Sequence, residues 1–353
     1  MTIRDASEDI LPLFLESAEK CGFKLALRRQ QPALWQRALD QSAFIPVAYT
    51  EKVLRYQLAY LAPGSGEILD FSVVLLHENE PAGVWPLFLQ FANEWQFRSH
   101  EGNLLPPLFV SGLSSRTEKA MTNACLDLLE LLGQSIKASR SWRSSEFFRN
   151  AFGTSQWHHS WMTRGASLDV GHDLYVDLSL DLTQIKSTLR KSYRSLITSG
   201  EKLWRVAILR DTDPAIWTEF RLLHQHVAGR ETRSIATWDL QAQAISDGSA
   251  FLVYLRDEHA RMVGGGYFNL SRDEGVYGVG AYDRSLFAKP LGHVVQWHAI
   301  QEMKARGLRW YRIGPRPYPG DKSAPTQKEL AIAEFKDGFA THTFLSLHAS
   351  LNL

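Results

Sequence analysis

Ala250-Phe-Leu-Val-Tyr-Leu255 and Met262-Val-Gly-Gly-Gly-Tyr-Phe-Asn-Leu270 are two apolar runs separated by a short charged segment. Runs of this length on either side of a turn predict a β-hairpin. The next run, Gly275-Val-Tyr-Gly-Val-Gly-Ala281, precedes a helix-like segment at 293–306 and another strand-like run, Leu308-Arg-Trp-Tyr-Arg-Ile313. The order hairpin, strand, helix, strand predicts an α/β (α+β) domain in the last third of the chain.

Three helices are predicted just before this hairpin. The segment 182–202 has apolar residues at helical spacing, with Thr183 as its cap and Gly200 as its end. Two further amphipathic segments follow, at 214–228 and 237–246. Helices of this kind are expected to cover the sheet that the strands form.

The first half of the chain predicts a second sheet with its own helices. Helical spacing runs to about residue 40, and an apolar helical stripe lies at 126–132. Strand-like runs are expected between these helices, at 44–49, 53–61, 71–76 and 82–91. The stretch 73–90 resembles 252–269, since both are two strands around a charged turn, and this suggests an internal duplication. We therefore expect domains at 1–165 and 166–353, each a mixed, mostly antiparallel sheet flanked by helices.

Composition is that of a globular protein with two ordinary cores. The 353 residues are 44% apolar and 22% charged, and the formal net charge is +1. This balance argues against a chain built mainly to coat nucleic acid. Cys21 and Cys125 are read as small buried hydrophobes of a reducing compartment. The acidic N-terminus has no signal core and no window reaches the roughly 20 apolar residues of a membrane span, so a cytoplasmic protein is expected.

Basic side chains gather at two places that could bind phosphate. Arg190, Lys191 and Arg194 share a face of the helix predicted at 182–202. That face could contact a polyanion, or it could simply be solvated. Arg230 and Arg233 lie in a loop after a helix, where they could clamp a phosphate or carboxylate, or pair with a neighbouring Glu.

Other candidates lie in the last third of the chain. Gly265 is the middle of three glycines inside a strand, which marks either a bulge or the close approach of another backbone or a ligand. His293 is either a general base or a structural histidine, and Asp283 lies in the same region. Lys336 stands between aromatic residues beside a glycine, where its cation could stabilise charge that develops in a reaction, or lie exposed on a strand. Neither His-Glu-x-x-His nor Gly-x-Ser-x-Gly is present, so a metal hydrolase or a serine nucleophile is disfavoured.

Across about residues 182–342 these features resemble the FemAB-like branch of the GNAT acyltransferase superfamily. The resemblance is carried by the basic helix, the Arg-bearing loop, the hairpin, and three motifs: Gly280-Ala-Tyr-Asp283, Gly307-x-x-x-Tyr-x-Ile-Gly314 and Phe335-Lys-x-Gly-Phe339. It implies two tandem GNAT-like domains and transfer of an acyl or aminoacyl group to an amine. The catalytic residues that we then expect are Lys336, His293 and Asp283. The expected substrate- or donor-binding residues are Arg190, Lys191, Arg194, Arg230, Arg233, Gly265, Tyr282 and Phe335.

The resemblance leaves the donor and the acceptor open. The chain lacks both the helical-hairpin arm of peptidoglycan-bridge enzymes and the Gln/Arg-x-x-Gly-x-Gly/Ala signature of simple GNAT domains. Acyl-CoA is the expected donor, with aminoacyl-tRNA as the alternative and no metal. The expected acceptor is an amine of a small molecule, a sugar nucleotide or a cell-envelope precursor. A non-catalytic binding module on the same fold is the third possibility, and the oligomeric state is not predicted.

Overall fold

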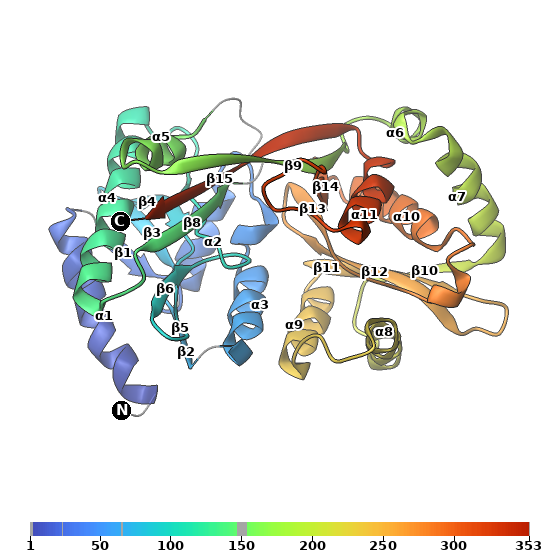
Figure 1. The fold of residues 1–353 in the computed structure, drawn as a ribbon, viewed down its shortest axis with the longest axis horizontal. Coiled ribbons are helices and arrows are strands. Elements are labelled where there is room, and N and C mark those ends of the chain that lie inside the picture. Colours follow the sequence, from blue (N-terminus) through green and yellow to red (C-terminus); the bar gives the residue numbers. More distant parts are fainter. Residues whose placement is uncertain (1–2, 23, 65, 147–153, 353) are drawn as a thin grey trace. The chain divides into compact units, whose positions relative to one another are not determined.

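The computed structural model describes residues 3–22, 24–64, 66–146 and 154–352 (Figure 1). The chain forms two units: unit 1 contains residues 1–170 and 346–353, and unit 2 contains residues 171–345. The last eight residues thus group with unit 1, whereas the sequence placed them in the second domain. The boundary expected between residues 165 and 166 stays a prediction. Two long strands, β9 (Ser167–Asp177) and β15 (His342–Asn352), have residues in both units.

Unit 1 has a central four-stranded sheet in the order β1-β3-β4-β7. Its strands are β1 (Lys24–Leu27), β3 (Val73–His77), β4 (Glu80–Trp85) and β7 (Leu108–Phe109). Val73 and Leu75 belong to a core with α1 (Ile3–Lys20), α4 (Ser115–Ile136) and α5 (Gln156–Thr163). Val74 belongs to a second core with α2 (Pro32–Asp40) and α3 (Glu51–Leu61). Successive side chains of a strand point to opposite faces, so helices cover both faces of this sheet.

The remaining strands of unit 1 lie outside that sheet. A three-stranded sheet has the order β2-β5-β6, formed by β2 (Glu67–Asp70), β5 (Phe88–Phe91) and β6 (Trp95–Arg98). Strand β8 (Ser141–Glu146) pairs antiparallel with the end of β15. The strands expected at 71–76 and 82–91 are confirmed in outline, and the turn between β3 and β4 uses positive φ angles at Glu78 and Asn79.

Two predicted strands of unit 1 are wrong. Residues 47–49 form a 3-10 turn, and 51–61 form helix α3. In α3, Val53, Leu54 and Gln57 are buried, while the rings of Tyr56 and Tyr60 stack four residues apart. These spacings are those of a helix, but a short apolar run in the sequence is compatible with either a helix or a strand.

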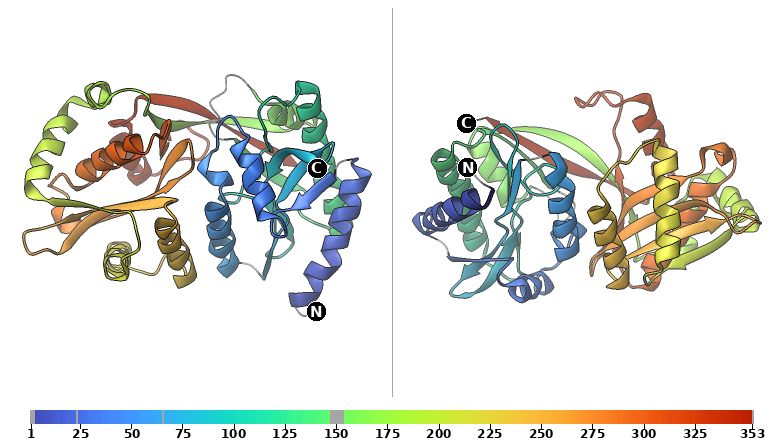
Figure 2. Two further views of the ribbon diagram at one scale, coloured as in Figure 1. Left: turned by 180° about the vertical axis from the view of Figure 1, so that it is seen from behind. Right: turned by 90° about the horizontal axis from the view of Figure 1, so that it is seen from below.

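Unit 2 is built on one mixed sheet in the order β10-β11-β12-β13-β14-β9-β15-β8, of which the last strand, β8, belongs to unit 1. After β9 its strands are β10 (Arg205–Leu209), β11 (Ala250–Arg256), β12 (Met262–Leu270), β13 (Glu274–Tyr282) and β14 (Trp310–Pro315). Helices α8 (Pro214–Ala228) and α9 (Ile235–Ser246) cover one face. Helices α6 (Leu182–Thr188), α7 (Lys191–Leu203) and α10 (Leu291–Ala305) cover the other, as Figures 1 and 2 show. The predicted hairpin, strand, helix and strand are all present, and the predicted fold class is confirmed.

The helix expected at 182–202 is two helices. Asp181, not Thr183, caps α6 by a capping box with Gln184. The backbone is extended at Leu189 and Arg190, and α7 begins at Lys191. Gly200 does not end a helix but lies inside α7.

Gly200 has a packing role in that position. A Cβ there would lie 2.4 Å from Cγ2 of Val294 on α10. The glycine therefore lets α7 and α10 approach closely.

Candidate functional site

Strands β13 and β14 run parallel, and they are paired over only part of their length. Their paired residues are Glu274 with Trp310, Gly275 with Tyr311, and Val276 with Arg312. Beyond this point β13 stays paired with β12 as far as Tyr282. Strand β14 stays paired with β9 as far as Pro315. The two strands therefore part after Val276 and Arg312. The segment that leads to α10 begins at the carboxyl end of β13, where the strands are no longer paired.

The ammonium of Lys336 lies at this parting. Lys336 is on α11 (Gln327–Asp337), and its Nζ is 5.6 Å from the ring centroid of Tyr277, the residue of β13 that follows the last paired position. A Cβ on Gly314 of β14 would lie 2.7 Å from the same nitrogen. Gly314 has φ +134°, a conformation that only glycine adopts readily. The chain thus places a cation between two strands that have just separated.

The Phe335-Lys-x-Gly-Phe339 motif is the C-terminal end of α11, and helical spacing explains its composition. Phe335 and Phe339 are four residues apart and both contact the ring of Tyr193, at centroid distances of 5.9 and 4.9 Å. A Cβ on Gly338 would lie 2.2 Å from that ring, so only glycine lets Tyr193 pack on the helix end. Lys336 lies about 100° around the helix from Phe335 and reaches Tyr277 instead.

His293 lies in an aromatic cluster at the start of α10. Its ring is 4.5 Å from Tyr193 and 5.1 Å from Phe335, both edge to face. Desolvation lowers its pKa to about 4. The imidazole is therefore neutral at pH 7 and a weak base, and its surroundings favour a packing role.

Two pairs of polar groups lie near the parting, and of their members Tyr277, Tyr311 and Gln296 were missed at the sequence level. The hydroxyls of Tyr277 and Tyr282 are 3.3 Å apart, and burial raises the pKa of both. The hydroxyl of Tyr311 donates to Oε1 of the buried Gln296. A detectable signal was Gly280: a Cβ there would lie 1.8 Å from the Tyr277 hydroxyl oxygen. Tyr282 was expected to bind the donor, and the structure joins it to Tyr277 at this place.

Of the three basic residues expected on one helix face, Arg190 has a different environment from the other two. Its backbone N–H donates to the carbonyl of Gly338, and its guanidinium donates to the carbonyl of Glu334 at 3.1 Å. Arg190 therefore clamps the end of α11. Lys191 and Arg194 are exposed on α7.

The loop after α8 does not form a paired arginine clamp. The guanidinium of Arg233 stacks on Trp238 at 4.4 Å and donates to Gln241. Burial is the main cause of the lowered pKa of His224, and the positive charge of Arg233 lowers that pKa further. Arg230 is exposed in the same loop.

The three glycines of β12 are explained by packing. A Cβ on Gly265 would lie 3.2 Å from the ring of Phe220 on α8. Cβ atoms on Gly264 and Gly266 would meet Tyr282 and Val295 at 2.8 Å each. Side chains from both faces of the sheet therefore occupy the space that a ligand at Gly265 would need.

Asp283 belongs to a different cluster. Its carboxylate accepts from the backbone N–H and the hydroxyl of Ser285, and it lies 3.7 Å from the guanidinium of Arg261. The hydrogen bond from the Ser285 hydroxyl is the main cause of its lowered pKa. None of its described contacts reaches Lys336 or His293.

The start of α10 can accept an anionic group. Pro290, the residue before the helix, supplies no side-chain cap, and the first turn has no acidic residue. The N–H groups of such a turn and the helix dipole favour phosphate. Lys289 lies beside them, with its Nζ 5.4 Å from the ring centroid of Trp204.

Two features are absent from the part of the chain that the structure describes. No cluster of three or more His, Cys, Asp or Glu side chains is arranged there to hold a metal ion. No described helix combines the length and hydropathy that crossing a bilayer requires.

Comparison with known proteins places the domain and the fold. Residues 184–323 match the acetyltransferase (GNAT) domain family. No curated protein matches the chain.

Three solved structures are similar over most of the chain. FemX has a TM-score of 0.68 and 13% identity, over 94% of this chain and 97% of that one. L-PGS from Bacillus licheniformis has a TM-score of 0.55 and 12% identity, over 90% of each chain. A tandem GNAT protein from the clavulanic acid biosynthesis pathway has a TM-score of 0.50 and 10% identity, over 93% of this chain and 98% of that one.

At such identities the solved structures establish the fold, and the family match establishes the domain. The predicted acyltransferase class is confirmed at the level of that domain. Residues 184–323 therefore form an acetyltransferase (GNAT) domain, and the chain as a whole has the fold of FemX and of the tandem GNAT protein.

Proposed function

We propose that this protein is an N-acyltransferase that transfers an acyl group from acyl-CoA to a primary amine. One observation carries the proposal: the ammonium of Lys336 lies where β13 and β14 part, beside Tyr277 and Gly314. Ligands of open α/β sheets bind beyond the carboxyl ends of parallel strands, where neighbouring strands diverge. The GNAT domain match at residues 184–323 supports this reading.

The reaction requires one bond to form and one to break. The neutral amine attacks the carbonyl carbon of the thioester, and the C–S bond breaks as the tetrahedral species collapses. The ammonium of Lys336 would stabilise the oxyanion in between, because a fixed cation needs no reorganisation when charge develops. The amine loses one proton, and the leaving thiolate gains one. Tyr277 and Tyr282, whose raised pKa keeps them protonated at neutral pH, are the proposed donors to the thiolate, and the proton that the amine loses restores the hydroxyl that donated.

The start of α10 and Lys289 are proposed to hold the donor's phosphates. They offer backbone N–H groups and a cation in place of the glycine-rich signature that the chain lacks. The proposed acceptor is an amino group of a small molecule, a sugar nucleotide or a cell-envelope precursor. Of the remaining predicted residues, we retain Phe335 for positioning Lys336, and we do not assign His293, Asp283 or Gly265 to acyl transfer.

Aminoacyl-tRNA is the second candidate donor, favoured by the exposed Lys191 and Arg194 on α7. Binding through these side chains would weaken steeply as salt rises, since phosphate contacts release counterions. Replacing both by Gln would then reduce both tRNA affinity and its salt dependence. A non-catalytic module would bind neither donor.

The test is a thermal-shift screen followed by a turnover assay. Acetyl-CoA, longer acyl-CoAs, coenzyme A and total tRNA are added to the full chain, since a ligand of the folded state raises Tm. The proposal expects an acyl-CoA to raise Tm and, with an amine panel, to release free thiol. A shift with tRNA alone would favour the second candidate. No shift with any donor would contradict both.

A further inference from the structure

A polar cavity lies in unit 2, and the proposed transfer reaction does not use it. It has a volume of about 410 Å³, which is in the range of small-molecule sites. Three segments form it: the end of α8, the turn between β11 and β12, and the short η3 turn (Arg284–Leu286) that follows β13. The lining residues are His226, Val227, Ala228, Gly229, Arg261, Asp283, Arg284 and Ser285.

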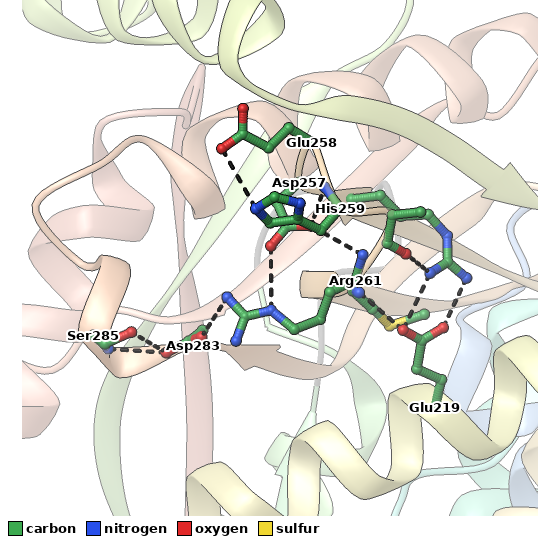
Figure 3. A network of polar contacts seen from close by, with 10 residues as sticks. Glu219, Asp257, Glu258, His259, Arg261, Asp283 and Ser285 are labelled. Atoms are coloured by element: carbon green, nitrogen blue, oxygen red, sulfur yellow. Dashed lines mark hydrogen bonds and ion pairs between the residues drawn. The ribbon is translucent and has the colours of Figure 1, made fainter.

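Hydrogen bonds hold two of these three walls together. Glu219 of α8 makes a two-point ion pair with Arg256, with bonds of 3.1 and 2.7 Å. The same carboxylate accepts from the backbone N–H of Met262 at 2.8 Å. Glu219 thereby fixes α8 against both strands of the hairpin (Figure 3).

Arg261 joins the hairpin turn to the third wall. Figure 3 shows its guanidinium between the carboxylates of Asp257 and Asp283, at 3.2 and 3.7 Å. Asp283 is itself fixed, because its backbone N–H donates to Val263 and its Oδ1 accepts twice from Ser285. The walls are therefore set before any ligand arrives, which reduces the cost of binding.

The cavity has a positive side and a negative side. Arg261 and Arg284 supply guanidiniums, and the side chain of Arg284 is exposed and has no hydrogen bond or ion pair to the described residues. Asp283 supplies a carboxylate, and its lowered pKa keeps it ionised at neutral pH. The carboxylate can still accept hydrogen bonds at Oδ2. The end of α8 at Gly229 adds the negative end of a helix dipole.

We propose that this cavity binds a small zwitterion, a molecule with an ammonium and a carboxylate on neighbouring carbons, as in a free α-amino acid. The ammonium would face Asp283 and the end of α8, and the carboxylate would face Arg284 and Arg261. A simple anion would meet the charge of Asp283, and a simple cation would meet the two guanidiniums, so both signs on one ligand fit best. The cavity shares no lining residue with the contacts of Lys336, so this proposal stands apart from the proposed transfer reaction.

Saturation-transfer NMR with three matched probes tests the proposal. L-alanine carries both charges, propionate lacks the ammonium, and ethylamine lacks the carboxylate. The proposal expects saturation transfer from the full chain to L-alanine and little to the other two at the same concentration. Because Arg261 and Arg284 are exposed to solvent, binding is expected to be weak, in the millimolar range.

Substitutions locate the site. Arg284→Ala and Asp283→Asn should each weaken L-alanine binding by about fivefold or more. Arg205→Ala, which removes an exposed arginine on β10, should not. Far-UV circular dichroism checks that each variant folds. If Asp283→Asn unfolds because the Asp283 cap is lost, Arg284→Ala alone tests the site.

Two results would overturn the proposal. The first is equal transfer to L-alanine and propionate. The second is an L-alanine signal that survives Arg284→Ala. Inorganic phosphate bound by wild type and by Asp283→Asn but not by Arg284→Ala would show a simple anion site instead.

Discussion

Gly338→Ala is expected to destabilise unit 2 through the ring of Tyr193. The added Cβ would lie 2.2, 2.6 and 2.9 Å from Cε2, Cζ and the hydroxyl oxygen of Tyr193, a residue that is 5% exposed. Overpacking of this kind costs about 1–3 kcal/mol. The backbone cannot easily move away, because the carbonyl of Gly338 accepts from the N–H of Arg190 at 2.9 Å. Alanine also restricts the unfolded chain more than glycine does, which stabilises the folded state by about 0.4–1 kcal/mol. The net decrease in the free energy of unfolding is therefore about 1–2 kcal/mol.

A double-mutant cycle isolates the cause. Tyr193→Leu alone leaves a cavity, but in its background Gly338→Ala should cost at least about 1 kcal/mol less than in wild type. The assay is native-state hydrogen exchange of amides in α7, α10 and α11, because two units need not unfold together. An alanine variant as stable as wild type, or additive effects in the cycle, would refute the packing explanation of the motif.

Three further predictions concern other parts of the chain. Gly200→Ala should lower the stability of unit 2 in the same exchange assay, since its Cβ would meet α10 at 2.4 Å; a gain in stability would show that the helices can separate cheaply. His293 has a folded pKa of about 4, below its unfolded value, so stability should fall as pH drops from about 6.5 to 4, by about 1–2 kcal/mol given its partial exposure. In urea unfolding at several pH values, His293→Phe should lose this decrease in the free energy of unfolding. A variant with the wild-type pH profile would contradict the prediction. Arg28 is 4% exposed between Glu51 and Asp70, so Arg28→Ala should cost about 3–5 kcal/mol in unit 1, and a loss below 1 kcal/mol would show that the carboxylates reach water.

The sequence predicted the elements of unit 2 well because their signals are local. The hairpin around 257–261 and helices α8 and α9 have strong periodicity and clear caps, such as Asp213 and Gly229. The break between α6 and α7 was missed because nothing local forbids a helix at Leu189. The strand expected at 53–61 is a helix for a related reason, since a short apolar run fits both periods.

The candidate site was predicted only in part because its geometry is tertiary. Lys336 was singled out from its motif, but its neighbours Tyr277 and Gly314 are on two strands far from it in sequence. Arg190 and Arg233 looked like ligand-binding cations, and instead they make contacts with helix ends and rings. Charge alone does not distinguish a free cation from one that clamps its own fold.

Turnover by Lys336→Met tests the role proposed for the ammonium of Lys336. The comparison is the rate of thiol release from the best acyl-CoA and amine pair, for wild type, Lys336→Met and Lys336→Arg, with donor affinity measured on each by calorimetry. We predict that Lys336→Met lowers kcat by about 10²–10³-fold while donor Kd changes by less than about tenfold, and that Lys336→Arg recovers part of the rate. A methionine variant that folds, binds the donor and turns over at the wild-type rate would contradict it.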